Sequence, residues 1–482
     1  MTLSPTSYDK LYINGEYVAA KSSATLELRS PITNDLVTDK VPIAGQEDVD
    51  IAVAHAEAGF NGPWSQFTAA QRSACLRKLA DLLETEVEPI LTLDTLTMGS
   101  PVSLIPTREN GYIRSCLLYY AGWTDKQRGD YFPADDGFVK LVTHEPIGVC
   151  VAINPYNAPV ASFIMKAAPC LATGNTLIVK PSEKSPLGSL ALAPLFEKAG
   201  FPKGVVQVLS GDGSTGALLS SHMRVRKISF TGSTNTGRKI QELAARSNLK
   251  RVTLELGGKS PAIVFDDANI ENALTWTING ILTRSGQVCV AASRVYVQEG
   301  IADAFIKAYT ERMKDARSRL GDPHDPNVSM GPLADSIALE KVKSMIERGK
   351  NEAELVVGGL QHGDVGCFME PTVFLNPKPN AQVLKEEVFG PVAVVQTFKT
   401  EEEVIKLAND TEFGLMAGVF TKDINRAMRL SSQIESGVVG INCISVMNLQ
   451  APFGGKKASG IGREFGEYGL RMFTEPKTVL IK

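Results

Sequence analysis

The feature that most constrains the fold is a regular alternation of short apolar runs and helix-like stretches between residues 148 and 247. Continuous apolar runs predict strands that are buried on both faces, and the stretches between them have helical spacing. Strands are predicted at 148–155, 175–182, 204–211 and 227–233, and helices at 159–172, 189–200, 216–223 and 237–247. This order indicates a doubly wound parallel sheet, because parallel strands need crossover helices.

The same alternation returns in the second half of the chain, so we expect two α/β domains. Strands are predicted at 260–267, 292–300, 393–400, 417–423 and 437–443, with long helices at 69–93 and 301–318. A turn signal, Asp135-Asp136-Gly137, lies between two β-prone runs within 128–146 and predicts a hairpin that leaves the first domain. The C-terminal run 477–482 is a further strand without a partner nearby in the sequence.

Charge and cysteine usage exclude several classes of function. The net charge is −3, so we expect no nucleic-acid or membrane partner. The N-terminus has no export signal and no stretch is apolar enough to span a membrane, which predicts a cytosolic protein. The seven cysteines and five histidines are scattered, which disfavours disulfides and a metal site. Cys289 is then a core thiol or a nucleophile, and a core thiol is the more common case.

Two glycine-rich stretches resemble nucleotide-binding loops without matching them. "GDGSTG" (211–216) has GxGxxG spacing, but the acidic residue expected about 20 positions later is absent, which favours a tight turn. "GSTNTGRK" (232–239) approaches an NTPase phosphate loop, but Arg238 occupies the lysine position. Backbone N–H groups at such a strand-to-helix turn suit a pyrophosphate. A pyrophosphate site and a structural turn therefore both remain open at Gly232 and Ser233.

Lys180 and Glu183 follow the predicted strand 175–182. Ligands of open α/β sheets bind beyond the carboxyl ends of the strands. A carboxylate there can accept hydrogen bonds from both hydroxyls of an adenosine ribose and would repel a 2′-phosphate. Taken alone, the pair is equally well explained as a solvated loop.

Five stretches, in this order, resemble the aldehyde dehydrogenase superfamily. They are "INPYNAPV" with Asn157, "LELGGKSP" with Glu255, "GQVCVAASR" with Cys289, "KEEVFGPV" with Glu387, and "PFGGKKASGIGREFGEYG". The resemblance runs from "LYINGEYV" to "EPKTV", which is nearly the whole chain. It implies a Rossmann-type cofactor domain, an α/β catalytic domain and a small β oligomerisation element in a homodimer or homotetramer. The corresponding ranges are 1–127 with 147–257, then 258–457, then 128–146 with 470–482.

The resemblance implies that Cys289 attacks an aldehyde and forms a thioester. The Asn157 amide and the Cys289 N–H would hold the oxyanion. Glu255 would then activate water to release the acid. The flanking valines predict a raised thiol pKa. Two groups could lower the pKa of the thiol again and so make it reactive: Glu255, acting through water, or the cationic nicotinamide. The sequence leaves the choice between them open.

The implied cofactor is NAD, with NADP also open. Lys180 and Glu183 would hold the adenosine ribose, and Gly232 and Ser233 the pyrophosphate. Glu387, with Phe389 beside it, would hold the ribose on the nicotinamide side. The other residues expected around the cofactor are Ile153, Asn154, Tyr156, Ser182, Gly213, Phe230 and Leu256. Tyr156 departs from the family, which usually has tryptophan at this position.

The substrate tunnel implied by the resemblance is mainly apolar. Its expected residues are Ala158, Ser162, Met165, Val288, Val290, Ile444, Met447, Leu449 and Phe453. None is basic, so no residue would bind a substrate carboxylate, which favours a medium or bulky aldehyde over the semialdehyde of a dicarboxylic acid. The alternatives are a semialdehyde dehydrogenase, a CoA-acylating relative, which would not need Glu255, and a catalytically inactive binding protein on the same fold.

Overall fold

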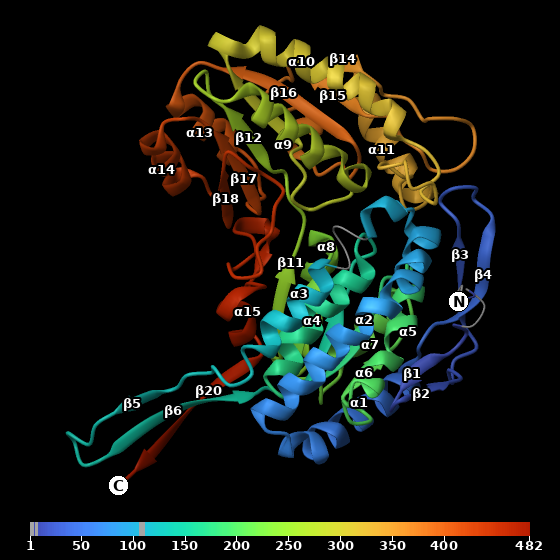
Figure 1. Cartoon of the computed structure of the whole chain (residues 1–482), viewed down its shortest axis with the longest axis vertical. Coiled ribbons are helices and arrows are strands. Elements are labelled where there is room, and N and C mark those ends of the chain that lie inside the picture. The colour runs from blue at the N-terminus through green and yellow to red at the C-terminus, as the bar shows by residue number, and fades with distance from the viewer. Residues whose placement is uncertain (1–3, 5–7, 106–110) are drawn as a thin grey trace.

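The computed structural model describes residue 4, residues 8–105 and residues 111–482. Two α/β lobes and a projecting arm make up the molecule (Figure 1). Most of the first residues, where no export signal is predicted, lie outside the described part. No helix in the described residues is long and apolar enough to cross a membrane.

The first lobe is built on an eight-stranded sheet in the order β19-β11-β10-β7-β8-β9-β1-β2. Its five central strands are parallel: β7 Val149–Ile153, β8 Thr176–Lys180, β9 Val206–Val208, β10 Lys227–Thr231 and β11 Arg251–Glu255. Four of these strands were predicted, and the doubly wound reading is confirmed. Three antiparallel strands complete the edges, namely β1 Leu11–Ile13, β2 Glu16–Val18 and β19 Gly460–Ile461.

Helices cover both faces of this sheet, which explains why β7, β8 and β9 are buried along their whole length. One face packs against α2 Ala69–Met98, α3 Gly111–Ala121, α4 Pro159–Ala172, α5 Leu187–Leu192 and α6 Pro194–Lys198. The other packs against α1 Gln46–Asn61, α7 Gly213–Ser221 and α8 Thr234–Arg246. The single helix predicted at 189–200 is wrong: α5 ends before Pro194 and α6 begins there, because proline cannot donate the next helical hydrogen bond.

The second lobe holds a seven-stranded sheet in the order β14-β15-β16-β13-β12-β17-β18. The five predicted strands correspond to β12 Pro261–Val264, β13 Arg294–Gln298, β16 Val392–Phe398, β17 Met416–Phe420 and β18 Val438–Ile441. Two further strands, β14 Glu354–Val357 and β15 Thr372–Leu375, extend the sheet. Its helices are α9 Ile270–Leu282, α10 Ala302–Asp315, α11 Ser336–Gly349, α12 Gln382–Lys385, α13 Glu401–Asn409 and α14 Ile424–Gln433.

The arm is a three-stranded antiparallel sheet that projects from the first lobe (Figure 1). The predicted hairpin supplies β5 Asp130–Phe132 and β6 Val139–Pro146. The C-terminal strand β20 Thr474–Ile481 follows the short helix α15 Gly466–Arg471 and pairs with β6 from Thr474↔Pro146 to Ile481↔Val139. A separate two-stranded sheet is formed by β3 Thr25–Arg29 and β4 Leu36–Pro42.

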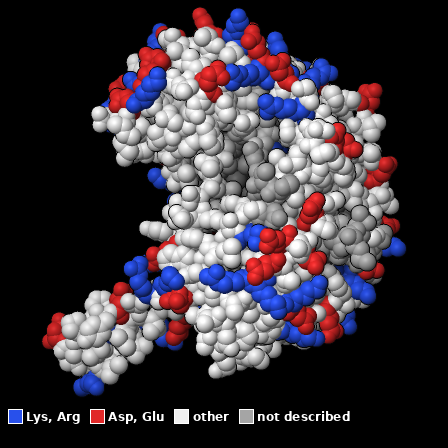
Figure 2. All heavy atoms as spheres, viewed as in Figure 1, with Lys and Arg blue, Asp and Glu red and all other residues white. Residues whose placement is uncertain are grey.

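The chain crosses from the first sheet to the second between β11 and β12. A hollow opens between the two lobes in the space-filling view (Figure 2). The crossing segment, residues 256–260, therefore joins the two sheets at the level where the lobes meet.

Candidate active site

The crossing segment lies against the loop that carries the candidate nucleophile. Glu255 ends β11, a glycine pair follows, and β12 begins at Pro261. A Cβ atom on Gly258 would lie 2.4 Å from the carbonyl oxygen of Cys289, so the two backbones are in close contact. Only glycine allows such an approach. The structure thus brings the segments of Glu255 and Cys289 together, as predicted.

The Cys289 thiol is weakly acidic in this setting. Its side chain is partly buried against the apolar core of the second lobe. Burial, with a smaller contribution from the carboxylates of Glu387 and Glu255, raises the pKa of the thiol to about 12. The raised pKa predicted from the flanking valines is confirmed. The thiol is therefore protonated at neutral pH, and attack requires a base or an arriving cation.

Asn157 is held by the loop that precedes the nucleophile. It lies between β7 and α4, where Ala158 caps the helix and Pro159 is its first residue. The Asn157 Nδ2 donates to the carbonyl oxygen of Gln287 at 2.7 Å. Tyr156, its neighbour, donates from its hydroxyl to Gln287 Oε1 at 3.4 Å. One hydrogen of the Asn157 amide is thus used within the protein, which leaves the other for a ligand.

Glu255 is buried, and its Oε2 atom has no hydrogen-bond partner in the described part of the chain. A Cβ on Gly454 would lie 2.6 Å from the other oxygen, Oε1. Burial raises the pKa of Glu255 well above its usual range, and the charge of Glu464 raises it further, while Lys166 and Arg463 lower it. A carboxylate with a raised pKa is a stronger base once ionised, which suits proton abstraction from water.

A buried ion pair behind Glu255 was missed in the sequence. Lys166 of α4 pairs with Glu464, and its Nζ also donates to Ser229 Oγ at 3.1 Å. Lys166 is almost fully buried and is the single charged residue in the apolar sequence of α4. A lone lysine in an otherwise apolar helix indicates a buried charge that needs a partner, so the sequence did carry a signal for Lys166. Glu464 offered none, because only the tertiary fold brings its loop to α4.

The residues predicted to hold an adenosine ribose lie together beyond the end of β8. Lys180 Nζ lies 3.2 Å from Glu183 Oε2. The Lys180 side chain is buried, and this burial lowers its pKa. The Glu183 side chain, in contrast, is 47% exposed. Nearby, both side-chain polar atoms of buried Asn154 lack partners among the described residues. Ser182 of the same loop and Ile153 at the end of β7 are also buried.

The predicted pyrophosphate turns have the shape that an anion site needs. Ser233 caps α8, and its Oγ accepts from the Thr236 N–H. Gly213 begins α7, and a Cβ there would meet nothing within 4 Å. Phe230, which packs under Gly232, and Leu256 are buried. The open space at Gly213 and the exposed Ser233 at the start of α8, together with the Lys180–Glu183 pair, fit a dinucleotide.

Glu387 lies across from these residues, against the crossing segment. Its Oε1 accepts a hydrogen bond from the Gly258 N–H at 2.9 Å, and burial raises its pKa. Phe389, with a left-handed backbone at φ 59°, packs edge-on against Tyr156 with ring centroids 5.9 Å apart. Glu387 thus contacts the segment that also touches the nucleophile.

The predicted tunnel residues fall into two groups. Those that are partly buried and pack against the two cores are Ala158, Met165, Val288, Met447 and Leu449. Those that are buried are Ser162, Val290, Ile444 and Phe453. Tyr112 of α3, which no sequence signal singled out, packs against the same core as Cys289 and Met165. Its buried hydroxyl has no partner among the described residues.

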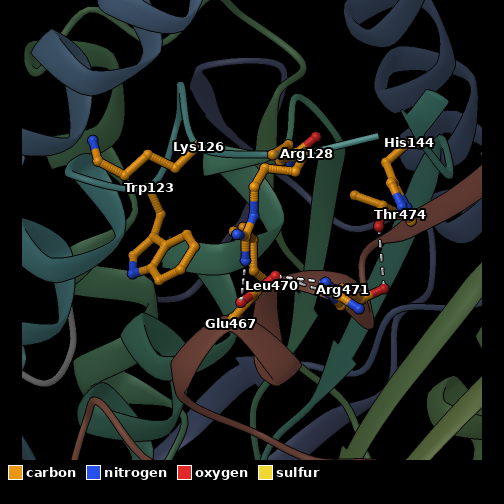
Figure 3. A pocket seen from close by; sticks show the side chains of 9 residues that line it. Trp123, Lys126, Arg128, His144, Glu467, Leu470, Arg471 and Thr474 are labelled. Atoms are coloured by element: carbon orange, nitrogen blue, oxygen red, sulfur yellow. Dashed lines mark hydrogen bonds and ion pairs between the residues drawn. The ribbon is translucent and has the colours of Figure 1, made fainter. Parts of the chain in front are cut away.

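A small pocket at the base of the arm contains none of the predicted site residues. Figure 3 shows Arg128 and Arg471 turned toward Glu467, with Trp123 and His144 beside them. Both arginines pair with that carboxylate, at 3.5 Å and 2.6 Å. The positive charge in the pocket is therefore largely used within the protein.

Comparisons with known proteins agree with this geometry. The model of the family described as "Aldehyde dehydrogenase family" matches residues 17–479. An aldehyde dehydrogenase of Emericella nidulans is 43% identical over 97% of this chain and 94% of its own length. Aldehyde dehydrogenase 1A1 of Equus caballus is 45% identical over 98% and 95%.

Solved structures share the fold over nearly the whole chain at somewhat lower sequence identity. The NAD+ complex of a Bacillus cereus aldehyde dehydrogenase superposes with a TM-score of 0.95 at 39% identity, over 98% of this chain and 96% of that one. A mutant of AldA, the indole-3-acetaldehyde dehydrogenase of P. syringae, in complex with NAD+ and IAA, has a TM-score of 0.96 at 36% identity over the full length of both chains.

Proposed function

The chain belongs to the aldehyde dehydrogenase family, and we propose that it oxidises an aldehyde to the carboxylic acid with NAD+. The observation that carries this proposal is the arrangement around the crossing segment. Gly258 packs on the carbonyl of Cys289, Asn157 donates to the carbonyl of Gln287 two residues before Cys289, and Glu255 ends the strand that leads into the segment.

In the first step, the Cys289 sulfur adds to the aldehyde carbon and the carbonyl oxygen becomes an oxyanion. The free hydrogen of the Asn157 amide and the Cys289 backbone N–H would donate to this oxyanion. Loss of one such donor typically costs about 10²–10³ in rate. The thiol proton must leave first, because burial keeps the pKa of Cys289 near 12.

The cofactor would lie along the carboxyl ends of the first sheet, with Lys180 and Glu183 at one end and Glu387 at the other. When bound, NAD+ supplies the hydride acceptor for the C–H bond of the thiohemiacetal on Cys289. Neighbouring structures include NAD+ complexes, which supports this use. We propose that Glu183 favours NAD+ over NADP+, because its half-exposed carboxylate would repel a 2′-phosphate.

The thioester left on Cys289 would be hydrolysed by water that Glu255 deprotonates. The buried position and raised pKa of Glu255 suit this role. The adjoining Lys166–Glu464 pair supplies charged groups that can exchange the proton onward. This carboxylate favours hydrolysis over transfer of the acyl group to a thiol, so a CoA-acylating enzyme is the weaker alternative.

We propose a medium or bulky apolar aldehyde as the substrate. The predicted tunnel residues Met165, Val288, Met447 and Leu449 are apolar, partly buried and packed against the same core as Cys289, and Ala158 packs against the core of the first lobe. Similar structures include enzymes named for indole-3-acetaldehyde and for gamma-glutamyl-gamma-aminobutyraldehyde, both larger than acetaldehyde. A semialdehyde remains the second candidate, because the latter name describes a polar substrate.

A kinetic panel of aldehydes with NAD+ and NADP+ tests these proposals. Each buried methylene contributes about 0.8 kcal/mol, so kcat/KM should rise well over tenfold from acetaldehyde to hexanal. A flat series, or the best activity on succinic semialdehyde, would overturn the apolar tunnel. Absence of NADH production from every aldehyde would overturn the function itself.

The domain roles also remain proposals. Residues 1–127 and 147–257 would bind the cofactor and residues 258–457 would carry the nucleophile. The arm of 128–146 and 470–482 would join subunits into a homodimer or homotetramer. Its apolar side chains Tyr131, Phe132, Leu480 and Ile481 are exposed in the single chain and would be buried by a second subunit. We place the protein in the cytosol, as the name of the relative from Elephantulus edwardii does for that protein.

A further inference from the structure

A strained turn precedes the nucleophile. Arg284, Ser285 and Gly286 all have left-handed backbone conformations, with φ of 49°, 53° and 76°. This conformation costs a non-glycine residue about 1–2 kcal/mol. Two such residues in succession persist only where their surroundings hold them, and such strain is frequent at functional sites.

Each residue of the turn is held from outside. Ser285 Oγ donates to the carbonyl of Gly331 at 2.6 Å. Gly286 packs so closely on the carbonyl of Gly390 that a Cβ would overlap it. Arg284 Nη1 donates to the backbone carbonyl of Asn157 at 2.7 Å. One anchor of the turn is therefore the residue that carries the oxyanion amide.

The loop before Cys289 grips Asn157 at two points. The Arg284 guanidinium binds its backbone carbonyl, and the Gln287 carbonyl accepts from its side-chain amide, each at 2.7 Å. A hydrogen bond from a charged donor is roughly twice as strong as a neutral one. Two bonds to different parts of one residue fix both its position and the direction of its amide.

We propose that Arg284 is a positioning residue, which sets the Asn157 amide at the correct distance from the Cys289 sulfur. The inference rests on the proposed function of this site. Oxyanion donors act at about 2.7–3.1 Å, and a misplacement of about 1 Å can cost 10²-fold in rate. Arg284 would thus govern acylation of Cys289 without touching the substrate. Cofactor affinity should change little, because Arg284 contacts the loop between β7 and α4, whereas Lys180 and Glu183 lie at and beyond the end of β8.

The test compares Arg284→Met and Arg284→Lys with the wild type in two burst assays. One is the NADH burst with hexanal at saturating NAD+. The other is the p-nitrophenolate burst from p-nitrophenyl acetate, which needs no cofactor: the Cys289 S–C bond forms, the ester C–O bond breaks, p-nitrophenolate leaves with the electron pair, and the thiol proton passes to solvent. Arg312→Met, which breaks an ion pair with Glu271 on the surface, is the matched control.

Arg284→Met should slow both bursts by about tenfold to a hundredfold, with NAD+ affinity and melting temperature close to those of the control. Arg284→Lys should restore part of the rate, because lysine keeps one charged donor. In an Asn157→Ala background, Arg284→Met should add no more than about a twofold effect, since the side-chain amide that Arg284 positions is already lost while the backbone carbonyl that it binds remains.

Two results would overturn the inference. The first is a burst in Arg284→Met as fast as that of the wild type. The second is an equal loss with and without the Asn157 amide, which would mark a general structural role. The proposed function fails separately, if the wild type gives no NADH burst with any aldehyde. The ester burst would then still show whether Arg284 acts through Asn157.

Discussion

Replacing Gly258 by alanine should damage catalysis while sparing the cofactor site. The added Cβ would lie 2.4 Å from the carbonyl oxygen of Cys289 and 3.3 Å from Leu415 Cβ. The first distance must grow to about 3.4 Å for ordinary contact, and a backbone oxygen cannot rotate away as a side-chain tip can. The nucleophile loop must therefore shift by close to 1 Å, which predicts a fall of about 10²-fold in the acylation rate.

The neighbouring glycine offers a matched control. A Cβ on Gly257 would lie equally close, 2.4 Å, to Glu387 Oε2, which is the end of a flexible side chain. Gly257→Ala should therefore displace Glu387 and leave the Cys289 backbone in place. We expect KM for NAD+ to rise about tenfold, as for the loss of a charged hydrogen bond. At saturating NAD+, the burst should stay close to that of the wild type.

Stopped-flow NADH bursts over a range of NAD+ concentrations separate the two effects, and thermal melts exclude misfolding. The reasoning predicts that adjacent, chemically identical substitutions alter different constants: the burst rate in Gly258→Ala and the NAD+ dependence in Gly257→Ala. It is refuted if Gly258→Ala keeps a burst close to that of the wild type, or if both variants lose the same constant to the same degree.

Four other changes give measurable outcomes. Glu255→Gln should keep the NADH burst but slow the steady state by about 10²–10⁴, since only hydrolysis needs the base; loss of the burst itself would mean that Glu255 acts earlier. Glu183→Ser should narrow the ratio of kcat/KM for NAD+ over NADP+ by about tenfold, and an unchanged ratio would remove Glu183 from the ribose site. Alkylation of Cys289 by iodoacetamide without cofactor should rise about tenfold per pH unit from pH 7 to 10, because the pKa of the thiol is about 12; a plateau near pH 8 would contradict this. Burial lowers the pKa of Lys259 to about 7, so between pH 7 and 10 the unfolded chain binds one more proton than the folded chain. The free energy of unfolding of the wild type, measured in urea relative to that of Lys259→Met, should therefore rise by about 1.4 kcal/mol per pH unit. Parallel pH curves for the two proteins would refute this prediction.

The parts of the fold that were predictable are those set by local pattern. The central strands are continuous apolar runs because helices cover both faces, and that signal is local. The strand β11 was not predicted, because its sequence, RVTLE, alternates polar and apolar residues instead of forming a continuous apolar run. The break before Pro194 was missed; proline there removes a backbone donor, but Pro89 and Pro169 lie inside α2 and α4, so a proline alone does not predict where a helix ends.

The candidate site divides in the same way. Cys289, Glu255 and Asn157 stand out through ordered motifs. The left-handed conformation of Arg284 has no local signal, and Asn157, which its side chain contacts, lies 127 residues away in sequence. The ion pair of Glu464 with Lys166 likewise could not be predicted, because only the tertiary fold brings the two residues together.

The pairing of β19 with β11 can form only late in the synthesis of the chain. Glu255 ends a strand whose outer edge pairs with Gly460 and Ile461, roughly 200 residues later in the chain. Ribosomes add about 5–20 residues per second, so this edge waits about 10–40 s for its partner. During that interval the nascent chain exposes an open strand edge next to its proposed base, where another unfinished chain could pair. Synthesis rate and chaperone access at this edge would therefore limit the yield of active enzyme.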